Sequence, residues 1–115
     1  MTVKALAEAL SLRSLTNDSQ QELDREISGV YVGDLLSRAM SRVEADSLWI
    51  TIMSNINVVA VASLTDPACI LLCEDVEADD DMRARACEYG ITILGSSRSA
   101  YELCVEYHKL TDVSS

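Results

Sequence analysis

The chain has 115 residues and a formal net charge of −10 at pH 7, from 19 acidic and 9 basic side chains. Its length suits one domain around one hydrophobic core, spanning residues 1–115 with a frayed tail at 112–115. The negative charge repels phosphate backbones and anionic lipid surfaces, so we expect no nucleic-acid and no membrane partner. No long uncharged apolar run is present, and the first residues lack the layout of a signal peptide, which predicts a cytoplasmic protein.

The first part of the chain predicts a helix, a short strand, a loop and a longer strand. Apolar residues at a spacing of three to four follow Thr2, whose side chain can cap a helix over residues 2–11. A short strand is expected near residues 12–15 and a stronger one at 27–32. The polar residues 16–24 between them predict a loop.

The middle of the chain continues with a helix, a strand and a second helix. Asp34 is expected to cap a helix whose apolar face holds positions 35, 36, 39, 40 and 43, and residues 47–52 predict a strand. Ser54-Asn55-Ile56-Asn57 then offers capping side chains to an apolar helix at 58–64. Because this helix is apolar nearly all round, it has to be buried deep in the fold or against a second copy, and we expect a homodimer.

The last part predicts two more strands and two more helices. Asp66-Pro67 ends the apolar helix, and the expected elements that follow are a strand at 68–73, a helix at 82–89 ended by Gly90, and a strand at 91–94. Gly95-Ser96-Ser97 opens a final helix with an inward stripe of Ala100, Tyr101, Cys104, Tyr107 and Leu110. The alternation predicts a three-layer α/β/α domain with a small, mostly parallel sheet of about five strands.

Polar residues follow the predicted parallel strands, where ligands bind in open α/β sheets. The candidate ligand-binding residues are Gly33, Asp34, Ser54, Asn55, Asn57, Glu74, Ser96, Ser97 and Arg98. The alternative is that they are helix caps, since capping selects the same residue types. Arg98 is the most informative, because a cation is disfavoured in the first turn of a helix unless it holds an anion or a carboxylate such as that of Glu74.

No motif predicts catalysis, a cofactor or a metal. The chain lacks a GxGxxG sequence, a Walker loop and a metal-hydrolase signature, and its single histidine, His108, has no nucleophile at motif spacing. Its four cysteines, at positions 69, 73, 87 and 104, are expected to be reduced thiols. The acidic run at 74–81 lacks the glycine of a calcium loop and predicts a solvated helix start.

Four segments together resemble proteins of the DRTGG-domain family, particularly their short standalone members. They are residues 29–37 (GVYVGDLLS), Trp49-Ile50-Thr51-Ile52, residues 55–62 (NINVVAVA) and Ala100-Tyr101-Glu102. The family is similar in fold to the N-terminal domain of HPr kinase, and it also occurs in CBS-domain pyrophosphatases and some phosphate acetyltransferases. The resemblance therefore implies a regulatory or assembly role.

This sequence departs from the family at the letters that name it. Ser54-Asn55 stands where the family has Asp-Arg, and Cys73-Glu74-Asp75 stands where it has Thr-Gly-Gly. A Gly-Gly turn can present backbone amides to an anion, whereas the acidic side chains here disfavour phosphate at that turn.

Two functions follow from the sequence. The first is a non-catalytic regulatory domain that binds an adenine nucleotide or another small anion at the carboxyl ends of the strands. The alternative is a homodimeric adaptor without a ligand site, which docks onto an enzyme or signalling protein through its acidic face or its apolar helix.

Overall fold

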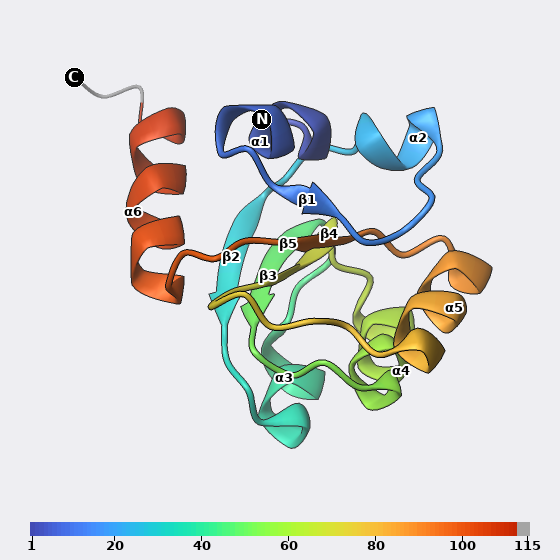
Figure 1. The fold of residues 1–115 in the computed structure, drawn as a ribbon. Helices are drawn as coiled ribbons and strands as arrows, with labels where there is room; N and C mark the ends of the chain where they lie inside the picture. The colour runs from blue at the N-terminus through green and yellow to red at the C-terminus, as the bar shows by residue number, and fades with distance from the viewer. Residues whose placement is uncertain (113–115) are drawn as a thin grey trace.

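Five strands form one mixed, mostly parallel sheet in the computed structural model, which describes residues 1–112 (Figure 1). The order across the sheet is β1-β5-β4-β3-β2, and only β1 runs antiparallel to its neighbour. The strands are β1 (Arg13–Ser14), β2 (Gly29–Val32), β3 (Ser47–Thr51), β4 (Cys69–Leu72) and β5 (Ile93–Gly95). All five predicted strands are present, with ends shifted by one or two residues.

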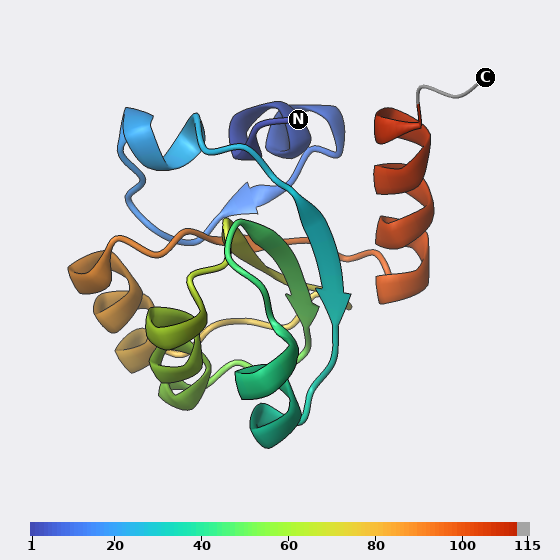
Figure 2. The same ribbon diagram turned by 180° about the vertical axis from the view of Figure 1, so that it is seen from behind.

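Helices cover both faces of the sheet, which confirms the predicted three-layer architecture. The described residues form α1 (Val3–Ala9), α2 (Gln20–Leu23), α3 (Leu36–Arg42), α4 (Ile56–Thr65), α5 (Asp80–Tyr89) and α6 (Ala100–Thr111). Helices α3, α4 and α5 cover one face, while α1 and α6 lie on the other (Figures 1 and 2). Helices α3, α4 and α5 share a face because of the topology. The three crossovers from β2 to β5 all step across the sheet in one direction and have the same hand, so each places its helix on the same side.

The core consists of two clusters, one on each face of the sheet. Every residue of β3 and β4 is buried, as expected for central strands that are covered on both sides. Trp49, fully buried, belongs to the cluster under α3, α4 and α5, and its indole Nε1 donates to the Gly33 carbonyl at 3.2 Å. Leu103 joins α6 to the opposite cluster.

Helix α4 is buried inside the fold rather than left free for a partner. Val58, Val59, Val61 and Ala62 are buried between the sheet and its neighbours, while Leu64 is exposed. This is one of the two predicted ways of burying the helix, so its apolar composition no longer argues for a dimer. None of the helices within residues 1–112 combines the length and apolar character that crossing a membrane requires.

The loop predicted at residues 16–24 is wrong in part, because α2 lies inside it. Ser19 accepts from the Glu22 amide at 3.2 Å, and the Glu22 carboxylate accepts from the Ser19 amide at 2.9 Å. This capping box begins a single turn of helix whose side chains are too polar to produce an apolar stripe.

Two predictions about helix starts are also wrong. Asp34 does not cap α3, which begins after Leu35 without a side-chain cap. Helix α6 begins after Ser99, whose hydroxyl accepts from the Glu102 amide, so Gly95-Ser96-Ser97 belongs to the preceding strand and loop.

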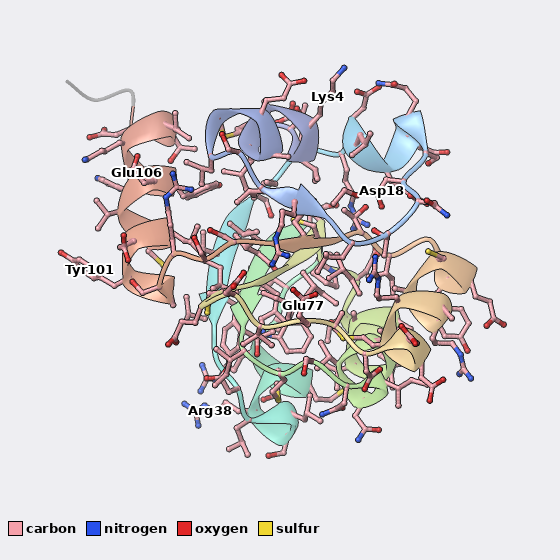
Figure 3. The ribbon with its side chains drawn as sticks, viewed as in Figure 1. Lys4, Asp18, Arg38, Glu77, Tyr101 and Glu106 are labelled. Atoms are coloured by element: carbon pink, nitrogen blue, oxygen red, sulfur yellow. The ribbon has the colours of Figure 1, made fainter. Side chains whose placement is uncertain are left out.

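The inward stripe of α6 differs from the predicted one. Ala100, Cys104 and Tyr107 pack against the core with the buried Leu103, whereas Leu110 is exposed and Tyr101 points away from the sheet (Figure 3). Positions 100, 103, 104 and 107 are three or four residues apart and lie on one face of the helix, and Tyr101 lies outside that face. The predicted frayed tail at 112–115 extends beyond the described residues.

Candidate functional site

A hollow of about 450 Å³ lies at the carboxyl edge of the sheet, beside the end of β5. It is lined by Leu10, Ser11, Arg13, Asp75 and residues 95–98. The strand β4 leads to α5 on one face, while the adjacent β5 leads to α6 on the other. Loops that diverge in this way open a crevice between neighbouring strands, which is where open α/β sheets bind ligands. We call it the carboxyl-edge hollow.

The turn after β4 forms one wall of this hollow and has an unusual backbone. Glu74 and Asp75 both have left-handed backbones, with φ of 58° and 60°. Their amides donate to the carbonyls of Arg98 and Ser96, each at 2.8 Å. These two amides are therefore occupied by the loop after β5 and do not face a ligand.

Arg13 reaches across the hollow from β1. Its Nη2 lies 3.1 Å from an Asp75 carboxylate oxygen, and its Nη1 lies 3.2 Å from a Glu77 oxygen. The guanidinium lies against Gly95, where a Cβ would stand 3.2 Å from Nη2. The lack of a side chain at Gly95 therefore makes room for the Arg13 side chain. All three charged side chains are substantially exposed, which makes these ion pairs weak.

Arg98 forms the opposite wall, at a different place from the predicted one. It precedes the cap of α6 instead of lying in its first turn, and its Nη1 donates to the Leu10 carbonyl at 2.7 Å. The hydrogen bond that joins it to Glu74 runs between backbones, from the Glu74 amide to the Arg98 carbonyl. Arg98 therefore ties the end of α1 to the loop after β5, and it lines the hollow.

The hollow is lined by two arginine side chains and by the Asp75 carboxylate. Ser97 is exposed at its rim, and its amide and hydroxyl have no partner within residues 1–112. Two guanidinium groups and these donors face the same space. Asp75 and Glu77 place two carboxylates beside the Arg13 guanidinium, and together they balance its charge.

Gly33 and Asp34, predicted as ligand residues, follow β2, the edge strand farthest from the hollow, and have structural roles there. A Cβ on Gly33 would stand 2.8 Å from the Tyr31 hydroxyl. The Asp34 carboxylate accepts from the Thr51 hydroxyl at 2.7 Å and the Ile52 amide at 2.9 Å. Asp34 therefore ties the end of β2 to the end of β3.

The predicted residues after β3 are also outside the hollow. Asn55 caps α4 by accepting from the Asn57 amide at 2.9 Å, as its alternative interpretation required. The Ser54 carbonyl accepts from the Asp79 amide, and Asn57 lies in the first turn of α4, where it lines a separate cavity between α4 and α5. Of the nine predicted residues, the structure brings together Glu74, Ser96, Ser97 and Arg98.

Sequence reasoning missed Arg13 and Asp75. Arg13 lies on a two-residue antiparallel strand, and no local pattern indicates which strand it joins. A signal for Asp75 was present in the resemblance. Glu74-Asp75 stands where the DRTGG-domain family has Gly-Gly, and a glycine pair predicts a left-handed turn.

Burial keeps three of the four thiols in their protonated form. Burial raises the pKa of Cys69 to about 12, and burial also raises the pKa values of Cys73 and Cys104. Cys87 on α5 is exposed. Within the described residues, no group of three or more His, Cys, Asp or Glu side chains is placed to hold a metal ion.

The fold and this site define a small α/β domain with a polar hollow at a divergence of loops. No protein-family model matches the chain, and no curated protein sequence matches it. Its fold is similar to a solved structure of the CBS and DRTGG domains of the regulatory region of Clostridium perfringens pyrophosphatase, complexed with its activator, diadenosine tetraphosphate. The TM-score is 0.73 at 9% identity, covering 90% of this chain and 44% of that one.

This likeness agrees, at the level of the fold, with the resemblance inferred from the sequence. The chain spans less than half the length of that regulatory region.

Proposed function

We propose that this chain is a non-catalytic regulatory domain of the cytoplasm, related to DRTGG domains, which binds a small anionic ligand in the carboxyl-edge hollow. The observation that carries the proposal is the convergence of Arg13, Arg98 and Ser97 on one space of about 450 Å³ where the loops diverge. Arginine guanidinium groups are suited to phosphate, because their fork of donors matches its oxygens.

An adenine nucleotide is the ligand class we favour. Support comes from the similar fold of a regulatory region that was solved with a dinucleotide activator. The Glu74-Asp75 turn weakens anion binding. Its two amides already donate to the Arg98 and Ser96 carbonyls, and its acidic side chains repel phosphate. We therefore expect modest affinity, with the phosphates held by side chains rather than by the turn.

Isothermal titration with diadenosine tetraphosphate, ATP and AMP tests this proposal. Wild-type protein is expected to bind at least one of them saturably, and Arg98→Gln to weaken binding by about ten-fold, the cost of one charged hydrogen bond. Arg42→Gln is the matched control, because Arg42 is exposed on α3 and has no ion pair within residues 1–112. No heat with any ligand into the millimolar range, or equal losses in both variants, would contradict the proposal.

The double variant Asp75→Asn with Glu77→Gln sharpens the test. It removes the two carboxylates that occupy Arg13 and leaves the guanidinium for the ligand. Affinity for the nucleotide is expected to rise by up to about five-fold for each pair removed, since an exposed pair contributes at most about 1 kcal/mol. Unchanged affinity would show that Arg13 does not contact the ligand.

The adaptor function remains the second candidate, because one observation favours it. Glu74, Asp75, Glu77 and residues 79–81 are all exposed around one turn and helix start, where they form a continuous acidic surface. Such a surface suits a basic protein partner. This function also includes the expected homodimer, and sedimentation of a monomer at high concentration would count against that part.

A further inference from the structure

Two adjoining cavities lie at the opposite, amino edge of the sheet, beside the carboxyl ends of α4 and α5. Their volumes are about 220 and 500 Å³, and both are lined by Glu22, Arg25, Asp66 and Gly90. We call the two together the amino-edge hollow. It shares no lining residue with the carboxyl-edge hollow.

Two helix ends point their negative poles at this hollow. Asp66 follows the last residue of α4 and Gly90 follows the last residue of α5, both in left-handed conformations, and both residues line the cavities. The last carbonyls of a helix favour a cation. Neither helix, each wholly within the described residues, has a basic residue in its last turn.

Arg25 supplies the missing cation at α4. Its Nη2 donates to the Asp66 carbonyl at 2.7 Å, and its Nη1 lies 3.1 Å from the Asp66 carboxylate. Its Nε donates to Asp46 at 2.8 Å. The charge of Arg25 is therefore used by two carboxylates and the end of α4, and it does not neutralise α5.

The end of α5 has a carboxylate beside it, while Arg85 of the same helix is engaged by Glu88 and by the Tyr89 ring. One Glu22 oxygen, Oε2, accepts from the Ser19 amide, while Oε1 would lie 3.1 Å from a Cβ placed on Gly90. A negative side chain next to a negative helix pole is unfavourable unless a cation joins them.

A second feature of the same cavity is a buried hydroxyl without a partner. Thr92 lines the smaller cavity and is 2% exposed, and its Oγ1 makes no hydrogen bond within residues 1–112. Buried hydroxyls are normally paired, because leaving one unpaired costs free energy. Tyr89, which is half exposed, adds an aromatic surface to the same wall.

We propose that the amino-edge hollow binds a small primary alkylammonium. Its ammonium group lies between the Glu22 carboxylate and the carbonyls that end α5, so its three N–H donors have acceptors on two sides, and Arg25 in the same hollow is held by Asp46 and Asp66. The alkyl chain packs against Tyr89, and the Thr92 hydroxyl, which has almost no surface open to the cavity, gains a partner when the bound ligand opens this wall. This site is independent of the anion site at the other edge.

The test is a titration of ¹⁵N-labelled protein with butylamine at pH 7, with butan-1-ol as the uncharged probe of the same size. The Gly90 and Thr92 amides are expected to shift saturably with butylamine and not with butan-1-ol. Saturable binding of butan-1-ol with equal affinity would overturn the proposal, as would the lack of any saturable shift at Gly90 with butylamine.

Glu22→Gln provides the matched variant, because glutamine keeps the reciprocal cap to Ser19 and removes only the charge. Butylamine affinity is expected to fall by about ten-fold, as for loss of one charged hydrogen bond. Glu8→Gln, at an exposed position on α1, changes the net charge equally and is expected to bind as wild type. Equal affinity of Glu22→Gln and wild type, or an equal loss in Glu8→Gln, would overturn the proposal.

Discussion

The left-handed residues Glu74 and Asp75 stand where the DRTGG-domain family, which the sequence resembles, has Gly-Gly, and their backbone is one that suits glycine. Both have positive φ, and both amides are satisfied by the loop after β5. Residues with a Cβ are strained in this region, because the Cβ approaches the following carbonyl. The turn therefore retains its shape at a cost in stability.

Glu74→Gly is expected to stabilise the protein. Relief of the left-handed strain outweighs the greater freedom of glycine in the unfolded chain, for a net gain of about 0.5–1 kcal/mol in the free energy of unfolding. Urea denaturation measures this gain. Glu74→Gln is the control, since it removes the same charge but keeps the Cβ, and a gain of the same size in that variant would assign the effect to charge instead.

Cys69 gives the chain a predictable weakness at alkaline pH. Its folded pKa of about 12 exceeds the ordinary value of 9.0, so the thiol ionises in the unfolded chain first. Its contribution to stability is complete below pH 9 and falls between pH 9 and about 12, by up to about 1.4 kcal/mol for each pH unit. Urea denaturation from pH 8 to 10.5 measures the slope.

Cys69→Ala separates this thiol from the other groups that ionise at high pH. The variant is expected to be less stable at neutral pH, because it loses buried volume, but its stability should fall less steeply above pH 9 than that of the wild type. Parallel slopes for the two proteins would show that Cys69 does not control the alkaline loss.

At the scale of elements, α4 shows how an ambiguous sequence is resolved by packing. Its composition allowed burial in the fold or in a dimer, and the crossover from β3 to β4 places it between α3 and α5. By contrast, α2 was missed because its four residues depend on a capping box rather than on an apolar stripe.

Val59→Ala and Leu64→Ala test the burial of α4 on its two sides. Val59 is fully buried and its truncation is expected to cost about 2 kcal/mol, from lost burial and the cavity left behind. Leu64 is 73% exposed, so its truncation should change stability by less than about 0.5 kcal/mol. Thermal or urea unfolding distinguishes them, and a large loss at Leu64 would indicate that this side is covered by a second copy.

At the scale of the whole molecule, the sequence predicted the architecture but only part of the site. The strands and most helices followed from periodicity and caps, because these signals are local. The contacts of Arg13 with Asp75 and Glu77 join residues more than sixty positions apart, and only the assembled sheet brings them together. Polar residues such as Asp34 and Asn55 looked alike as ligands or as structural groups, since both uses require the same side chains.

The central claim is that an anionic ligand binds in the carboxyl-edge hollow, and an amide chemical-shift titration with diadenosine tetraphosphate tests it most directly. Saturable shifts are expected at Gly95, Ser97 and Arg98, together with Asp75, while the Gly90 amide at the other edge stays unchanged. Saturable shifts confined to any other part of the chain, or no saturable shift into the millimolar range, would contradict the claim.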